Sequence, residues 1–414
     1  MITKKQRWTL GLLMSCGILI NYLDRINISH ALIPISEELN LSVAQQGIIL
    51  SAFSWGYVVF MSIGGILVDR FGPIKMAAIS ASFWSLATAI SGTANSYLSM
   101  LLARFSVGVG EAPIFPANAR IVKDEFPLEE RGRATALFDA GSYVGTALAA
   151  PIVVYVMLAF GWRISFIACA FIGLIWVYVW LKLAPKLTKT TDNNSSMSVS
   201  RVSRKEYFGL LRNKKILGAS YGFFCYNYAK SFFLTWFPAY LVTERGFSFI
   251  TVGIVGMIPA IFAVIGELIS GTFTDLMIKR GWSVTIARKL PLCLGLVLSM
   301  SIVFTEFVES HIAIISILSF SFAATIAASP SIWAIPGDIA PSPNFVGTIG
   351  GIQNTFSNTA GIVAPIITGL FVSYFDSFLP ALAFSSMIAL SGAISYWFIV
   401  GDLVPISPKE TSHG

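Results

Sequence analysis

The sequence predicts an all-α membrane protein in which twelve transmembrane helices form two halves of six. The first observation is composition: 55% of the 414 residues are hydrophobic and only 12% are charged, whereas a soluble domain carries about 25% charged residues. The second is that long apolar segments alternate with short polar loops, at a mean hydropathy of +0.74. The third is that short motifs of the first half recur in the second half.

Each apolar segment is long enough to cross the hydrocarbon core, which takes about 20 residues of helix. The twelve segments lie near residues 8–32, 45–68, 74–94, 97–121, 134–159, 163–183, 216–241, 251–276, 289–308, 311–334, 346–372 and 378–400. Basic residues precede the first segment, as in a signal peptide, but the segment is too long and contains Asp24 and Arg25. We therefore expect it to be retained as the first helix.

A polar stretch at residues 185–215 divides the chain into halves at 1–184 and 216–414. Its Ser, Asn and Lys content is typical of a solvated linker. Two six-helix halves related by a repeat place a binding site at their interface, near the middle of the membrane.

One repeated motif lies where the second and eighth spans end. Gly65, Asp69 and Arg70 follow the second span, and Gly271 and Asp275 follow the eighth span with the same spacing. We interpret this motif as a gating element that acts when the halves change conformation.

Basic residues predict the orientation of the chain. Of its 28 Lys and Arg residues, 23 fall in the tails and loops on one side, and the opposite loops hold only Arg163 and Arg245. This bias places both termini and the linker in the cytoplasm, so the chain is expected in the cytoplasmic membrane as a multi-pass protein. The net charge of +7 is then a topology signal and does not indicate a nucleic-acid partner.

Seven ionisable residues lie inside the predicted spans, more than two residues from either end. They are Asp24, Arg25, Arg104, Glu111, Asp139, Lys230 and Glu267. Four acids and three bases leave the interior at −1 when all are ionised, and burial disfavours a charged carboxylate. Binding of an anion therefore requires at least one carboxylate to take up a proton, and Asp24 and Glu111 are the acids nearest the bases.

The bases are the main candidates for holding an anion. Arg25, Arg104 and Lys230 lie at similar depths in the outer half of the membrane, and Arg104 shares a helix face with Glu111. Lys230 occupies the position in residues 227–230 that Asp24 occupies in the matching motif of the first half. Tyr22, Tyr57, Trp333, Asn354 and Asn358 are further candidates that would bind hydroxyl groups.

Purely structural roles compete with these assignments. Any of the aromatic and amide residues can be a packing residue, and Asp139 and Glu267 are expected in ion pairs that fix helix packing. His30 is expected as a residue at the outer helix end rather than as a proton relay. The four cysteines have no metal-like spacing, and no nucleophile–base pair or nucleotide-binding loop stands out. We therefore expect neither catalytic residues nor a metal or other cofactor.

Five strings resemble a known family. Residues 64–72 (GGILVDRFG) resemble the loop 2–3 signature of the major facilitator superfamily. Within it, residues 21–25 (NYLDR), 104–117 (RFSVGVGEAPIFPA), 130–134 (ERGRA) and 233–241 (FLTWFPAYL) resemble the anion:cation symporter family. The resemblance extends over essentially all twelve spans.

The resemblance implies a function and site residues. That family includes bacterial proton-coupled carriers of sugar acids and the vesicular glutamate and sialic acid transporters. By this similarity Asp24 and Glu111 match protonatable acids, Arg25 matches a substrate-side arginine, and the glutamate carriers have arginine at the position of Lys230. Asp139 stands where bacterial members more often have asparagine.

The sequence thus predicts a monomeric secondary transporter that carries a small organic anion, such as an aldonate, hexuronate or aldarate, inward with protons across the lipid bilayer. An anion exchanger with the same major facilitator fold is one alternative, and a sensor that binds solute without transport is another. The particular anion, its charge and the proton stoichiometry do not follow from the residues alone.

Overall fold

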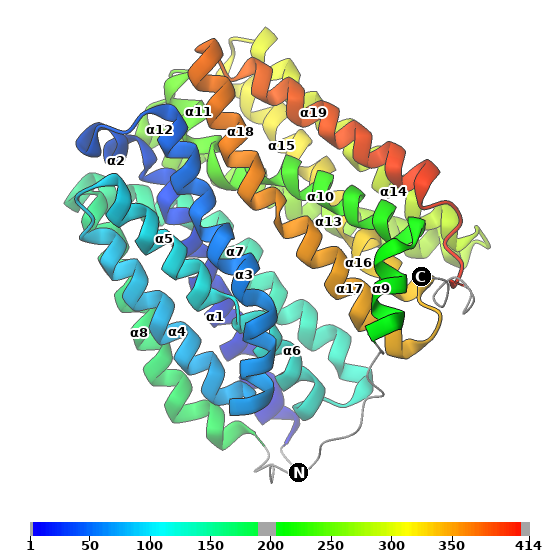
Figure 1. The fold of residues 1–414 in the computed structure, drawn as a ribbon. Coiled ribbons are helices and arrows are strands. Elements are labelled where there is room, and N and C mark those ends of the chain that lie inside the picture. The colour runs from blue at the N-terminus through cyan, green and yellow to red at the C-terminus, as the bar shows by residue number, and fades with distance from the viewer. Residues whose placement is uncertain (1–2, 189–203, 407–414) are drawn as a thin grey trace. The chain divides into compact units, whose positions relative to one another are not determined.

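The computed structural model describes residues 3–188 and 204–406. Within these ranges every regular element is a helix, so the predicted all-α class is confirmed (Figure 1). Residues 189–203 of the predicted linker, and Lys409 among the basic residues that fix the orientation, lie outside the described residues.

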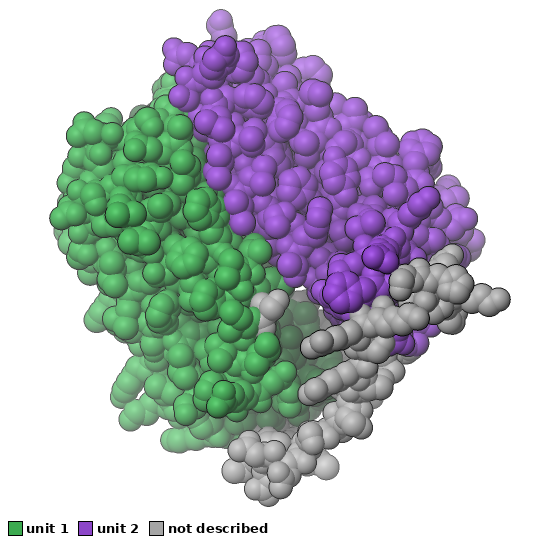
Figure 2. Space-filling model, in the orientation of Figure 1, with its two compact units in different colours: residues 1–195, 235–257 green, residues 196–234, 258–414 purple. Residues whose placement is uncertain are grey.

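Contacts group the chain into two compact units (Figure 2). Unit 1 consists of residues 1–195 and 235–257, and unit 2 consists of residues 196–234 and 258–414. The segment 235–257 belongs to unit 1 because its two short helices pack against α1 and α7. The division of the sequence at residues 185–215 stays a prediction.

Unit 1 contains the helices of the first half and two short helices from the second half. They are α1 (Lys4–His30), α2 (Leu32–Leu39), α3 (Val43–Phe71), α4 (Pro73–Gly92), α5 (Tyr97–Glu111), α6 (Ile114–Glu125), α7 (Leu128–Phe160), α8 (Trp162–Leu187), α11 (Phe237–Thr243) and α12 (Phe249–Val255). Within this unit α1 packs along α7, α3 along α5, and α4 along α8.

Unit 2 contains the remaining helices. They are α9 (Arg204–Arg212), α10 (Lys214–Thr235), α13 (Met257–Lys279), α14 (Val284–Ser299), the 3-10 helix η1 (Met300–Phe307), α15 (His311–Ala327), α16 (Ser329–Ile339), α17 (Pro343–Asn358), α18 (Ala360–Phe375), α19 (Leu379–Ile394) and the π-helix η2 (Ser395–Ile399). Here α14 packs between α15 and α19.

Among the described residues, 11 helical segments are long and apolar enough to cross a membrane. The remaining predicted span, 216–241, corresponds to α10, a helix of 22 residues, whose hydropathy is lowered by its tyrosines, Asn227 and Lys230. Large apolar side chains are exposed around the helices, for example Phe171 at 65% and Ile312 at 81%. Such a surface is suited to lipid.

Several predicted spans are broken where proline removes a helical hydrogen bond. The span predicted at 97–121 divides into α5 and α6 at Ala112 and Pro113. Pro238 lies at the start of α11 and Pro330 at the start of α16. A hydropathy pattern does not register these breaks, because the apolar run continues through them.

Glycines allow the helices of unit 1 to approach closely. A Cβ atom at Gly141 or Gly145 of α7 would meet the backbone carbonyl oxygens of Ser15 and Leu19 on α1. A Cβ at Gly108 of α5 would likewise meet the carbonyl oxygen of Phe53 on α3. Small residues at such crossings bring backbones together in a membrane, where packing drives helix association.

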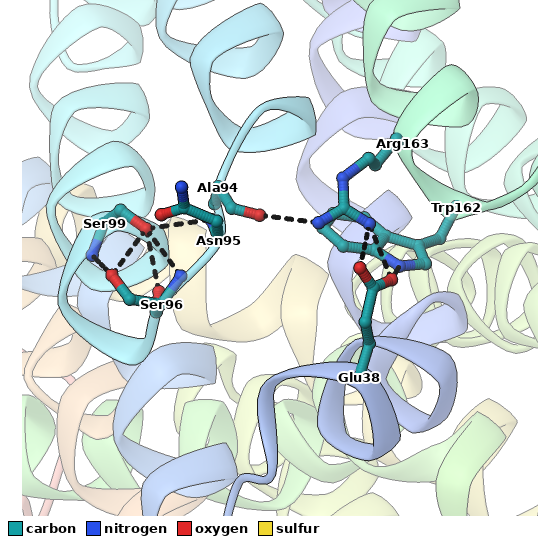
Figure 3. Close-up of polar contacts among 7 residues, drawn as sticks. All are labelled: Glu38, Ala94, Asn95, Ser96, Ser99, Trp162 and Arg163. Atoms are coloured by element: carbon teal, nitrogen blue, oxygen red, sulfur yellow. Dashed lines mark hydrogen bonds and ion pairs between the residues drawn. The ribbon is translucent and has the colours of Figure 1, made fainter.

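A polar cluster fastens one end of unit 1 (Figure 3). Glu38 of α2 accepts hydrogen bonds from Trp162 Nε1 at 2.7 Å and Arg163 Nη1 at 2.6 Å, both on α8. Arg163 Nη2 donates to the carbonyl oxygen of Ala94, which follows α4, at 3.1 Å. We call Glu38, Trp162 and Arg163 the Glu38 cluster. It joins α2, α4 and α8.

Candidate functional site

An ion pair joins α1 and α5 inside unit 1. Arg25 Nη2 lies 2.7 Å from Glu111 Oε2, and Arg25 Nε lies 3.1 Å from the same oxygen. The Glu111 side chain is 0% exposed, whereas 18% of the Arg25 side chain remains exposed. Charge-assisted bonds of this kind are strong, and a buried carboxylate without its partner is costly. The pair therefore links the protonation state of Glu111 to the position of the Arg25 side chain.

Aromatic rings surround the Arg25 guanidinium. Its Cζ lies 4.7 Å from the ring centroid of Tyr22, 4.4 Å from that of Phe53 and 5.2 Å from that of Tyr57. Phe53 and Tyr57 are stacked with centroids 5.6 Å apart. Arginine binds aromatic faces well because its planar cation is weakly hydrated. We call Tyr22, Phe53 and Tyr57 the aromatic cage.

Asp24 points away from the cage into the core of unit 1. Its side chain is buried, and Oδ2 accepts a hydrogen bond of 2.6 Å from Thr88 Oγ1 on α4. The other carboxylate oxygen, Oδ1, has no hydrogen-bond partner among the described residues. The two predicted proton-carrying acids therefore have different surroundings: Glu111 is paired with a cation, and Asp24 is bound by a hydroxyl.

Arg104 on α5 is a buried part of the same assembly. Its Nη2 donates to the backbone carbonyl oxygen of Arg25 at 3.3 Å, while Nε and Nη1 find no partner among the described residues. Arg104 and Glu111, expected on one helix face, therefore both reach Arg25. The Arg104 side chain is 1% exposed, so it holds α1 and α5 together in this state. Its predicted role in binding substrate stays a prediction.

The predicted residues of unit 2 form a different kind of site. The Trp333 ring packs edge-on against Phe223 at 5.2 Å, Phe223 lies 5.9 Å from Tyr226, and Lys230 Nζ lies 6.0 Å from the Tyr226 ring. We call Trp333, Phe223 and Tyr226 the aromatic row. It leads from an exposed indole on α16 to the ammonium of α10, and Trp333 is 56% exposed.

Two amides lie on α17 of unit 2. Asn358 Nδ2 donates to the backbone oxygen of Asn354 at 2.8 Å and to its side-chain oxygen at 3.0 Å. This bond fixes the orientation of both amides on one helix face. Their expected contacts with hydroxyl groups of a substrate stay a prediction, as does the role of Lys230 in holding an anion.

The predicted gating motif lies at helix ends. Asp69, whose side chain is 72% exposed, pairs with Arg120 Nη1 on α6 at 3.1 Å. Arg120 also pairs with Asp124 at 2.8 Å, whereas Arg70 lies over its neighbour Phe71. A Cβ at Gly65 would meet nothing within 4 Å.

Unit 2 contains its copy of the motif and an ion pair between two other helices. Asp275 is exposed near the end of α13, and Arg288 of α14 lies 3.3 Å from Asp338 of α16. Both units thus have an ion pair between helices, but the partners come from different positions of the repeat.

Several contributing residues were not predicted from the sequence. Phe53, Thr88 and Phe223 were absent from the predicted set because no charge or motif distinguishes their positions, and Arg120 was counted only among the basic residues that predict the orientation. Lys289 is 4% exposed and donates to the Trp397 carbonyl oxygen at 3.1 Å. It was missed because it is the first residue of the predicted span 289–308 and was counted with the preceding loop, whereas α14 already begins at Val284.

Comparison with known proteins agrees with this architecture. Residues 14–365 match the family profile described as Major Facilitator Superfamily. The probable galactarate/D-glucarate transporter GarP of Escherichia coli K12 is 36% identical, with 96% of this chain and 95% of the relative covered. The hexuronate transporter of Bacillus subtilis strain 168 is 32% identical, with 91% and 90% covered.

A solved structure shares the fold. It is a bacterial homologue of the human lysosomal transporter Spinster in an inward-facing, occupied conformation, with a TM-score of 0.78 and 18% identity, covering 96% of this chain and 97% of that one. At this identity the likeness concerns the fold alone. The family profile covers most of the chain and the sugar-acid transporters above are more than 30% identical over nearly all of it, so this protein belongs to the Major Facilitator Superfamily and is a transporter, not an enzyme.

Proposed function

We propose that this protein carries a sugar acid across the cytoplasmic membrane into the cell together with protons. The observation that carries the proposal is the Arg25–Glu111 ion pair. Arg25 is a cation that can bind the anion, and Glu111 is a buried acid that releases Arg25 when it takes up a proton. The names of the relatives, which are transporters of galactarate, D-glucarate, hexuronates and D-galactonate, support a sugar acid as the class of substrate.

The geometry supports a simple coupling step. While Glu111 is ionised, it occupies the Nε and Nη2 atoms of Arg25, which is the edge that binds a carboxylate in a bidentate manner. A proton on Glu111 neutralises it and frees this edge for the carboxylate of the substrate. Proton uptake and anion binding then favour each other.

The remaining predicted groups complete the proposed site. Tyr22 and Tyr57 hold the guanidinium in place, and the amides of Asn354 and Asn358 supply hydrogen bonds to hydroxyl groups. Both termini face the cytoplasm, as the distribution of basic residues indicates. One chain, acting as a monomer, suffices for this scheme.

Uptake by purified protein in proteoliposomes tests the proposal. With an inward proton gradient, we expect labelled D-glucarate or galactonate to accumulate, and we expect a protonophore to abolish accumulation. Arg25→Lys is the matched variant: it keeps the charge but removes the planar fork, so uptake should fall about tenfold or more, a loss of ~1.4 kcal/mol. Accumulation that survives the protonophore would favour anion exchange, and transport of no sugar acid would overturn the proposal.

A further inference from the structure

A row of polar side chains runs along the buried side of α1. Asn21, Asp24, Asn27 and His30 follow one another at intervals of three residues, with exposures of 0%, 1%, 0% and 5%. Residues three apart on a helix are neighbours, and His30 lies roughly 9 Å along the axis from Asp24. We call these four residues the polar row. Its first member, Asn21, interacts with the Glu111 carboxylate of the ion pair.

Helices α4 and α8 close the row with polar groups of their own. Ser165 Oγ on α8 donates to Asn27 Oδ1 at 3.0 Å, and Asn27 Nδ2 donates to Cys169 Sγ at 3.4 Å. Thr88 on α4 donates to Asp24 at 2.6 Å. Apolar side chains would pack such a helix crossing at no desolvation cost, so polar residues on three helices indicate a function.

Two polar atoms of the row lack partners. Asp24 Oδ1 and His30 Nδ1 have no hydrogen-bond partner among the described residues. A buried polar atom without a partner costs about 1–3 kcal/mol, and proteins usually satisfy such atoms with ordered water. The row therefore has the composition of a hydrated path.

Asn27 and His30 lie on a different side of α1 from Arg25. Successive residues of a helix are turned by about 100°, and 18% of the Arg25 side chain is exposed whereas Asp24 is buried. A proton can therefore reach Asp24 without passing the guanidinium that the anion would bind.

The row ends beside the Glu38 cluster. His30 is the last residue of α1, and the following helix α2 is held to α8 through Glu38 (Figure 3). Ser165, which contacts Asn27, also donates to the carbonyl oxygen of Trp162. The Glu38 side chain is 48% exposed, so the cluster that follows this end of the row lies at the surface of unit 1, while His30 itself is buried.

We propose that the polar row conducts protons between this end of unit 1 and Asp24. A proton from solvent passes to His30 or to water bound at its Nδ1, moves through water held by Asn27 and Ser165, and binds Asp24 Oδ1. The Asp24 carboxylate thereby becomes a neutral acid. His30 gives up the proton that it took from solvent and so returns to its neutral form. Glu111, Arg104 and Arg25 are the charged groups that act on Asp24, and Cys169 on α8 is a further titratable neighbour. The inference rests on the proposed proton coupling, in which it makes Asp24 a second site of proton uptake beside Glu111.

Two blocking variants and one control test the path in proteoliposomes. Asn27→Leu and His30→Leu replace polar groups of the row with apolar ones. Ser29→Ala is the control, because Ser29 is buried on the same helix but bonds only within it, to the Ile26 carbonyl oxygen. The readouts are proton uptake driven by D-glucarate, followed with an internal pH dye, and counterflow of D-glucarate without a proton gradient.

We expect both blocking variants to lower the initial rate of proton uptake about tenfold, a change of ~1.4 kcal/mol, with counterflow within about twofold of the wild type. Ser29→Ala should change neither rate. If both blocking variants took up protons at the wild-type rate, the proposed path would be overturned. Glucarate transport by the wild type without proton uptake would instead overturn the proposed function itself.

Infrared spectroscopy of the wild type keeps the test decisive if a variant does not fold. The band of protonated Asp24 is assigned by its loss in Asp24→Asn. On transfer to D2O, a hydrated row predicts that the Asp24 carboxyl proton exchanges at once and that this band shifts. Exchange of this proton only as slowly as the helices open globally would contradict the path.

Discussion

The two units hold their predicted site residues in contrasting ways. In unit 1, Arg25 and Glu111 form an ion pair of 2.7 Å, with Asp24 and Arg104 buried beside them. In unit 2, Lys230 forms no ion pair with any described residue, and its nearest aromatic partner is Tyr226 at 6.0 Å.

This difference separates two tasks. A cation paired with a buried acid changes its partner when the acid takes up a proton, so unit 1 can couple charge to binding. A cation beside an aromatic row has no such switch, but it offers a fixed charge and a shaped surface. We therefore place coupling in unit 1 and discrimination between substrates in unit 2, and the following predictions test that division.

The largest expected effect is on stability. Arg25→Ala leaves the Glu111 carboxylate buried without its partner, which should cost about 3–5 kcal/mol, whereas Lys230→Ala should cost ~1 kcal/mol or less. Thermal unfolding in detergent measures both. The double variant Arg25→Ala/Glu111→Gln should recover most of the loss, and equal losses for Arg25→Ala and Lys230→Ala would remove the contrast between the units.

Glu111→Gln should uncouple transport from protons. The amide resembles the protonated acid, so Arg25 is free to bind the anion in every state. We expect substrate exchange to persist and accumulation against a gradient to be lost, measured as counterflow and as proton-driven uptake in the same proteoliposomes. Full accumulation by this variant would move the coupling role to Asp24.

Lys230→Ala should change selectivity more than it changes coupling. A second base suits a substrate with two acidic groups, so affinity for D-glucarate should fall more than affinity for the monocarboxylate galactonate. The expected difference is about tenfold, or ~1.4 kcal/mol, by a binding titration. Equal losses for the two anions would mean that Lys230 does not contact the second carboxylate.

The smallest effect concerns the Glu38 cluster. Hydrogen bonds from Arg163 and Trp162 hold the pKa of the Glu38 carboxyl below its ordinary value of 4.5. A lowered pKa means that these contacts stabilise the folded protein above pH 4.5 and that the contribution is lost as the pH falls through the pKa of the folded state. Glu38→Gln should thus lower the melting temperature at neutral pH but not in acid, where Glu38 is already protonated. The change at neutral pH should be small because the group is exposed and screened. A difference that persists in acid would contradict this assignment.

The sequence by itself determined the membrane class, most of the span positions and the residues that carry charge into the membrane. These features are properties of short segments: length and hydropathy decide what crosses a bilayer, and a lone ionisable residue is conspicuous in an apolar run. The same local information indicated that Arg104 and Glu111 share a helix face.

Only the tertiary structure decided which groups meet. Glu111 pairs with Arg25, which lies 86 positions away in the sequence, and Phe53 and Thr88 join the site although nothing in the sequence distinguishes them. The polar row also became evident only when α4 and α8 were seen to close it. Such contacts depend on which helices cross and how closely, and in unit 1 that is decided by the absence of a Cβ at Gly108 and Gly145, which lets neighbouring backbones touch.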